Sequence, residues 1–316
     1  MPLEARDPLA DILALVRPEA VVAAEIRARG PFHLTFEGHP GVKFGVVVAG
    51  ACFMALRGRA PTRLRAGDVF LLGGQPAFSV GSDLEAPPRD ANLLLRRTTG
   101  RIAEIGRARG EPVVRLIGAR FALDPTHAHL LVDALPPMVR IPADEASPLR
   151  AVTRLLVDEV RASDPGRTRA LDQLAQLVLT YALRWLDADG RSPPRRGWLR
   201  ALATPGIAAA LRHIHAGMGA DTSLAGLARL AGMSRTTFAA RFKEVVGQPP
   251  RAYAIAWRMA LAKDALRTTN RPVGALAFEL GYKSESAFSA AFRRAVGVAP
   301  LRFRRMRLGT HAQRPT

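Results

Sequence analysis

A chain of 316 residues is long enough for two domains that each have their own hydrophobic core. Hydrophobic residues make up 48% of it, which excludes an intrinsically disordered protein. The net charge is +19 and is concentrated at one end: residues 198–316 hold 19 Lys and Arg against 5 Asp and Glu, whereas residues 1–197 hold 27 against 22. A basic domain attracts polyanions such as nucleic acids, although an arginine-rich surface alone is weak support for such a partner.

Cellular location is suggested by three features of the sequence. The single cysteine, Cys52, has no partner for an internal disulfide, which fits a reducing compartment. The longest apolar run, residues 44–56, contains two glycines and is too short for a membrane-spanning helix. The first residues include Glu4, Asp7 and Asp11 and lack the pattern of a signal peptide. We expect a cytoplasmic protein with no membrane partner.

Residues 32–123 contain short apolar, β-branched runs separated by glycines. This spacing predicts antiparallel strands in a sandwich or small barrel. From 147 to 186 the apolar residues recur with a helical period, which predicts two helices. The predicted strands are Phe32–Phe36, Val42–Val48, Cys52–Leu56, Val69–Leu72, Leu93–Leu95 and Val113–Ile117.

A polar stretch rich in Pro and Gly, residues 187–197, is predicted to be a linker. It divides the chain into an N-terminal domain, residues 1–190, which includes the helices at 147–186, and a helical C-terminal domain, residues 198–316. The predicted fold class is therefore a multidomain α+β protein.

The C-terminal domain contains an internal repeat, which is the strongest signal in the sequence. Residues 234–247 (SRTTFAARFKEVVG) match residues 284–297 (SESAFSAAFRRAVG) at a constant offset of 50. In each copy two phenylalanines stand at i and i+4, on one face of a helix. The leading serine suits an N-cap, and the closing glycine suits a left-handed C-cap.

A second short helix and a glycine turn precede each copy. The first helices are predicted at 224–230 and 273–280, with turns at 231–233 and 281–283. This is the layout of a helix-turn-helix, whose second helix enters the major groove of DNA. A helix predicted at 251–267, about 25 Å long, lies between the two units. Such a spacer suits two recognition helices about 34 Å apart, one turn of DNA.

Two segments carry a family resemblance. "SLAGLARLAGMSRTTFAARFKEVVGQPPRAY" and "RPVGALAFELGYKSESAFSAAFRRAVGVAPLRFR" closely resemble the DNA-binding domain of AraC-type regulators, over about residues 205–305. The resemblance implies a bacterial transcription factor, often an activator that contacts RNA polymerase. We therefore predict a sequence-specific, effector-responsive regulator that binds double-stranded promoter DNA and is not an enzyme.

The resemblance also assigns residues to DNA. Alanine at 240 and 290, where many relatives have long polar side chains, predicts modest base readout assisted by DNA shape. Glu285 has two interpretations: it accepts from a cytosine amino group, or it is a helix N-terminal acid favoured by the dipole. Phe238, Phe242, Phe288, Phe292, Trp257 and Leu261 are predicted core. The base-facing residues are Thr236, Ala239, Ala240, Glu285, Ser286, Ser289 and Ala290, and the phosphate candidates are Arg235, Arg241, Lys243, Arg258, Lys283, Arg293 and Arg294.

The N-terminal segment "FEGHPGVKFGVVVAGACFMALRGRAPTRLRAGDVFLLGGQPAFSV" resembles the cupin-type domain of one branch of AraC-type regulators, over roughly residues 7–190. Metal-binding cupins have histidines where Gly45 and Phe78 stand here, so we predict no metal and no cofactor. A small barrel can enclose one small ligand, and we expect a largely apolar or weakly polar effector and a homodimer. The residues predicted to face inward are Val46, Val48, Phe53, Val69, Leu71 and Phe78.

Three alternatives remain open at this point. A cupin enzyme with a DNA-binding tail would need the metal ligands that the sequence lacks. A nonspecific architectural DNA-binding protein would use the same basic helices without reading bases. A fully packed barrel would serve for dimerisation alone and bind no effector.

Overall fold

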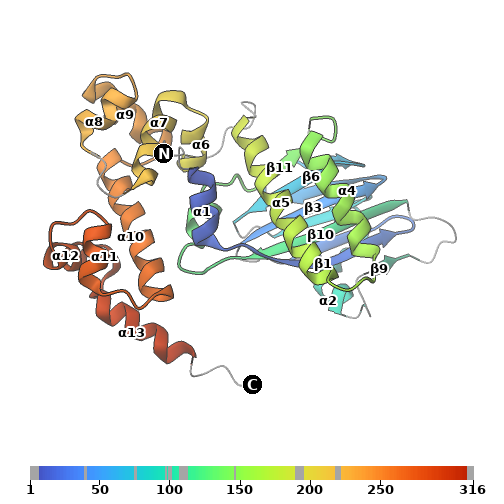
Figure 1. The fold of residues 1–316 in the computed structure, drawn as a ribbon. Coiled ribbons are helices and arrows are strands. Elements are labelled where there is room, and N and C mark those ends of the chain that lie inside the picture. The colour runs from blue at the N-terminus through green and yellow to red at the C-terminus, as the bar shows by residue number, and fades with distance from the viewer. Residues whose placement is uncertain are drawn as a thin grey trace. The chain divides into compact units, whose positions relative to one another are not determined.

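The computed structural model of the chain consists of two compact units (Figure 1). The sheet unit runs from Arg17 to Arg195, and the helical unit combines Met1–Val16 with Arg196–Thr316. Part of the predicted linker, residues 189–195, lies outside the described residues. The structure describes residues 7–38, 41–74, 77–96, 98, 102–106, 113–145, 147–188, 196–217 and 222–311.

Two β-sheets form the centre of the sheet unit. The larger has the strand order β11-β6-β3-β10-β1-β9, and the smaller has the order β5-β4-β7-β2-β8. Neighbouring strands are antiparallel, except that β9 on β1 and β8 on β2 are parallel. The strands are β1 (Glu19–Ala28), β2 (His33–Phe36), β3 (Val42–Ala49), β4 (Ala51–Leu56), β5 (Thr62–Arg65), β6 (Val69–Gly73), β7 (Phe78–Gly81), β8 (Arg89–Asp90), β9 (Ile102–Ile105), β10 (Val114–Ala122) and β11 (Val139–Ile141).

One predicted strand is wrong. Leu93–Leu95 lies in a helix, α2 (Ala91–Arg96), rather than in a sheet. The reason is Asp90, whose Oδ1 accepts hydrogen bonds from Asn92 N at 2.7 Å and Leu93 N at 3.3 Å. A carboxylate that satisfies the free N–H groups of a first turn favours a helix at that point.

The core of the sheet unit lies between the two sheets. The pairing places Lys43, Gly45 and Val47 of β3 opposite Arg120, Gly118 and Leu116 of β10, respectively. Because directly opposed residues project to the same face, these six share one face, and the buried Val47 and Leu116 belong to the core between the sheets. We call this the inner face of the larger sheet.

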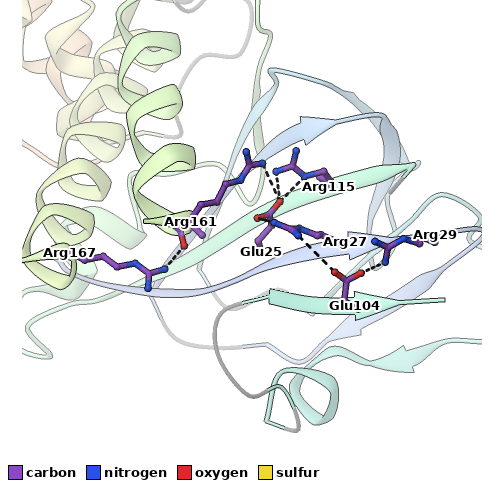
Figure 2. Close-up of polar contacts among 8 residues, drawn as sticks. Glu25, Arg27, Arg29, Glu104, Arg115, Arg161 and Arg167 are labelled. Carbon is purple, nitrogen blue, oxygen red and sulfur yellow. Dashed lines mark hydrogen bonds and ion pairs between the residues drawn. The ribbon is translucent and has the colours of Figure 1, made fainter. Parts of the chain in front are cut away.

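The outer face of the larger sheet is covered by the helices α4 (Ser147–Arg161) and α5 (Arg167–Ala188) (Figure 1). Glu25 of β1 is fully buried there, and arginines surround its carboxylate (Figure 2). Arg115 Nε donates to Glu25 Oε1 at 2.7 Å, Arg27 Nη2 donates to Oε2 at 3.0 Å, and Arg161 Nη2 of α4 lies 3.5 Å from Oε1. The ion pairs therefore connect two strands and one helix.

A short helix, α3 (Ala128–Val132), completes the described helices of the sheet unit, and all other described helices belong to the helical unit. The helical unit is all-α, as predicted. Its elements are α1 (Pro8–Val16), α6 (Trp198–Leu202), α7 (Pro205–Ala216), α8 (Leu224–Leu230), α9 (Arg235–Val246), α10 (Pro250–Thr268), α11 (Val273–Glu279), α12 (Glu285–Val296) and α13 (Pro300–His311).

The helix α1 lies in a different unit from the one that the sequence indicated. The sequence placed residues 1–190 in one N-terminal domain, whereas α1 packs against α7 and α10 of the helical unit. Ile12 and Val16 of α1 are buried, and Asp11 Oδ2 lies 3.4 Å from His215 Nδ1. The apolar face of α1 is thus buried against helices that begin about 190 and about 235 residues after it ends.

Candidate nucleic-acid interface and ligand cavity

The first helix-turn-helix consists of α8, a tight turn and α9. Ser223 Oγ accepts a hydrogen bond of 3.1 Å from Gly226 N in α8, and Ser234 Oγ accepts one of 3.2 Å from Thr237 N in α9. Gly247 ends α9 with a left-handed φ of +89°. These are the N-cap and C-cap that the sequence predicts.

The second helix-turn-helix repeats this geometry 50 residues later. Ser284 Oγ accepts a hydrogen bond of 3.2 Å from Ala287 N, and Gly297 ends α12 with a φ of +87°. Its first helix, α11, ends at Glu279, one residue before the predicted end. The two helix-turn-helix units predicted from the repeat are confirmed.

The paired phenylalanines bury the same face of each recognition helix. Phe238 and Phe242 of α9 are fully buried, as are Phe288 and Phe292 of α12. The ring centroids of each pair are 5.5 Å and 5.7 Å apart. Trp257 is also buried, whereas Leu261, the other predicted core residue, is half-buried and packs against the core of the second helix-turn-helix unit. Since the same face of each helix is buried, the same positions of each helix are left for solvent or DNA.

The predicted base-facing residues fall into two exposure classes. In α9, Thr236, Ala240 and Lys243 are exposed at positions i, i+4 and i+7, whereas Ala239 is half-buried. This recognition helix therefore presents a small polar side chain, an alanine and a cation along one stripe. The residues 50 positions later repeat the pattern, with exposed Ser286, Ala290 and Arg293 and half-buried Ser289.

Glu285 differs from the other base candidates. Its carboxylate lies beside the start of α11, because a Cβ added at Gly274 would be only 2.9 Å from Glu285 Oε2. Glu285 is also in the first turn of α12. A carboxylate close to helix N-termini is stabilised by their partial positive charge. This geometry favours the interpretation of Glu285 as a helix-terminal acid.

The predicted phosphate contacts are mostly exposed cations. The exception is Arg258, which is half-buried and donates a 3.0 Å hydrogen bond to Thr222 Oγ1. Arg241 forms an ion pair of 2.8 Å with Glu244 on the same helix. The exposed candidates are Arg235, Arg241, Lys243, Lys283, Arg293 and Arg294.

A concave surface of about 930 Å³ lies between the two helix-turn-helix units. Arg251, Arg258 and Arg294 contribute to its lining, and the described lining residues include no Asp or Glu. Arg251 is not among the phosphate contacts predicted from the sequence. Its place in the first turn of α10, directly after two prolines, is the feature that marks it as close to the first recognition helix.

A cavity of about 430 Å³ lies in the sheet unit and is within the size range of small-molecule sites. Among the six residues predicted to line an effector pocket, only Phe78 contributes to it. The core between the sheets contains Val47, Phe70 and Leu72, so the alternate residues of β3 and β6 face the outer side. These strands are buried on both faces, and a continuous apolar run does not reveal which residues point inward. The predicted residues outside the cavity lining are Val46, Val48, Phe53, Val69 and Leu71.

The described residues also bear on metal binding, on thiol reactivity and on membrane insertion. No group of three His, Cys, Asp or Glu side chains is placed to hold a metal ion in the described part of the chain. Cys52 is buried on β4, and burial together with the charge of Asp68 raises the pKa of its thiol to about 12. A thiol with that pKa is a poor nucleophile at neutral pH. Within the described ranges, no helix is both long and apolar enough to span a membrane.

Comparison with known proteins covers nearly the whole chain. Residues 7–187 match a cupin family model, and residues 227–306 match a helix-turn-helix domain model. An AraC-like transcription regulator of Streptomyces antibioticus is 36% identical over 303 residues, which is 95% of this chain and 98% of that protein. A second one, from Streptomyces lividans, is 35% identical over 95% of this chain and 98% of its own length.

One solved structure that is similar to this chain covers about a third of it. The DNA-binding domain of AdpA in complex with target DNA is 31% identical, covers 35% of this chain and 96% of that chain, and has a TM-score of 0.31. The family is established by the sequence matches over the full length. The chain belongs to the AraC family of transcription regulators and is a sequence-specific DNA-binding protein with a cupin domain before its two helix-turn-helix units.

Proposed function

We propose that the helical unit binds promoter DNA by placing α9 and α12 in two consecutive major grooves. The observation that carries this proposal is the match between the two recognition helices in caps, buried phenylalanines and exposed stripe. The helix between the units, α10, has 19 residues and is about 28 Å long. A rigid spacer of this length suits recognition helices separated by about one turn of DNA.

The exposed stripes are the proposed base contacts. Thr236 and Ser286 can donate to base edges, and Ala240 and Ala290 can touch a thymine methyl group. Half-buried Ala239 and Ser289 flank these stripes. Because alanine offers no hydrogen bond, each unit distinguishes few bases, and specificity depends on both units and on DNA shape.

The cupin domain is proposed to hold a small-molecule effector that changes DNA binding. A ligand shifts DNA affinity only by its differential affinity for the binding-competent state, and the usual coupling is about 1–3 kcal/mol. The cavity in the sheet unit supplies a space of suitable size. Membership of the family supports the further proposals that the protein works in the cytoplasm as a homodimeric activator and contacts RNA polymerase.

The test is a pair of variants on α12, used after genome-wide mapping has identified bound promoters in the host. Ser286→Arg should change which sequences the purified protein protects from nuclease digestion, because it places a bidentate donor for guanine on the exposed stripe. Arg293→Gln, seven residues later, should weaken binding to all sequences and reduce the salt slope by about 1, because it removes one phosphate contact.

The footprint also distinguishes a sequence-specific regulator from a nonspecific architectural DNA-binding protein. We expect discrete protected sites that span two consecutive major grooves. Uniform protection of any duplex, with no change of preference in Ser286→Arg, would instead identify a nonspecific architectural protein and contradict the proposal.

A further inference from the structure

The cavity in the sheet unit is largely apolar inside, and the exposed part of its lining is polar and includes two arginines. Ile26, Phe70 and Leu116 belong to the core between the sheets and contribute to the wall. Among the lining residues, Asn92 and Arg96 of α2 and Arg120 of β10 are exposed. A ligand in this space would have an apolar body inside and a polar group near the solvent.

A missing side chain on the inner face of the larger sheet helps to leave this space open. Gly45 and Gly118 are direct partners across β3 and β10. A Cβ on Gly45 would lie 2.2 Å from the ring of Phe70, so that position is filled by a neighbour. A Cβ on Gly118 would meet no atom within 4 Å, so that position faces open space. Gly118 has no left-handed backbone, so its φ does not require glycine.

Two cations lie opposite each other two residues further along the same strands. Lys43 and Arg120 are direct partners in the register, on the same face as the glycines. Like charges directly opposite each other destabilise a sheet. Burial and the charge of Arg120 lower the pKa of Lys43. The register therefore brings two positive charges together on this face, where they would favour a bound anion.

Lys43 is held over the cavity by aromatic rings. Its Nζ lies 5.1 Å from the ring centroid of Phe78 and 5.9 Å from that of Phe36, and the two rings are stacked with centroids 4.5 Å apart. Nζ also donates a 3.3 Å hydrogen bond to the backbone oxygen of Glu37. An ammonium group has three donors. Lys43 lines a largely apolar cavity, where its ammonium group could bind an anionic group of a ligand.

We infer that this cavity binds an apolar carboxylate, with the carboxylate at Lys43 and Arg120 and the apolar body beside Gly118 and Phe70. The described lining residues include three cations, Lys43, Arg96 and Arg120, and no Asp or Glu. This inference rests on the proposed effector role of the cupin domain and names the class of ligand. It replaces the expectation of a largely apolar or weakly polar effector.

The test compares octanoate with 1-octanol by isothermal titration calorimetry on the full chain. The two probes share an alkyl body and differ in charge. Octanoate should bind at least about tenfold more tightly, since hydrogen bonds to charged groups contribute more than neutral ones. Equal affinity for both probes, or no binding of octanoate, would overturn the inference, and this comparison needs no variant.

Variants then locate the carboxylate and the alkyl body. Lys43→Met and Arg120→Met should each remove most of the preference for octanoate, whereas Arg63→Met, an exposed arginine on β5 outside the lining, should leave it intact. Gly118→Leu should weaken both probes because it fills the open space. A preference retained in both Met variants would place the anion elsewhere and contradict the inference.

The outcome is separable from the proposed function. The nuclease footprint of the protein without any added ligand tests DNA recognition alone. A discrete footprint with no octanoate binding would reject the carboxylate site and leave the regulator intact. Octanoate binding without a discrete footprint would reject sequence-specific promoter binding and leave the site.

Discussion

Glu25 is a buried carboxylate whose charge is balanced by arginines from three elements of the sheet unit. Burial works to raise its pKa, but the hydrogen bonds from Arg27 and Arg115 and their charges hold the pKa below its ordinary value of 4.5. A group with a lowered folded-state pKa stabilises the fold above its unfolded-state pKa. That contribution is lost as the pH falls through the folded-state value.

The corresponding prediction concerns Glu25→Gln. At pH 7 this change should destabilise the sheet unit by about 3 kcal/mol, because it leaves guanidinium groups partly buried without their anion. The wild type should lose stability as the pH falls from about 5 towards 3, and the variant should lose less. Urea unfolding at several pH values, followed by circular dichroism, measures both effects.

Glu104→Gln is the matched control for this measurement. Glu104 also pairs with Arg27 and Arg29, but 45% of its side chain is exposed. Exposed ion pairs contribute little, so this variant should resemble the wild type at every pH. A similar loss in both variants would show that burial of Glu25 is not what makes its ion pairs important.

At the scale of elements, helices were predicted more accurately than strand faces. Each helix-turn-helix combines a serine cap, two phenylalanines at i and i+4, and a closing glycine, so several local signals agree. Strand β3 lacks such agreement, because both of its faces are covered and its apolar residues run continuously. The predicted pocket residues of β3 and β6 were therefore assigned to the wrong face, and Lys43 and Gly118 were not identified.

The fold of α2 and the environment of α1 show two other limits of sequence reasoning. Leu93–Leu95 looks like a strand because three leucines in succession carry no helical period. The cap at Asp90 decides its structure, and a single local hydrogen bond is a weak signal in sequence. The packing of α1 depends on contacts with residues far along the chain, and no local pattern indicates those.

The rotation of the recognition helices leads to a prediction for α12. Phe292→Ala should destabilise the second helix-turn-helix by about 3–5 kcal/mol, because the ring is fully buried between Phe288 and Phe303. Ser289→Ala, three residues earlier, should leave stability nearly unchanged and alter the preferred DNA sequence. Thermal unfolding and binding to a promoter library measure the two effects. If both variants lost similar stability, Ser289 would belong to the buried face of α12 and not to its DNA-facing side.

At the scale of the whole molecule, the chain passes between its two units twice. It leaves the helical unit after Val16, enters the sheet unit at Arg17, and returns at Arg196. The first passage has no linker, because β1 begins at Glu19. The backbone therefore joins β1 of the sheet unit directly to α1, which packs on α7 and α10 of the helical unit.

The contacts of α1 are built around a buried histidine of the helical unit. His215 is fully buried, shares a 2.9 Å hydrogen bond between its Nε2 and the hydroxyl of Tyr253, and stacks on Trp257 with centroids 3.8 Å apart. Asp11 faces its other ring nitrogen. Burial, with the charge of Asp11, raises the pKa of Tyr253, which keeps the hydroxyl protonated. The helix thus completes a polar cluster inside the helical unit.

This arrangement predicts that α1 stabilises the DNA-binding half. Ile12 is buried, so Ile12→Ala should destabilise the helical unit by about 2–5 kcal/mol and leave the sheet unit unchanged. In a Trp185→Phe background the two remaining tryptophans, Trp198 and Trp257, both lie in the helical unit, and their fluorescence during urea unfolding reports on it alone. Ala14→Ser, on the exposed side of α1, is the control. If Ile12→Ala unfolds at the same urea concentration as this control, α1 does not stabilise the helical unit in solution, and the prediction is wrong.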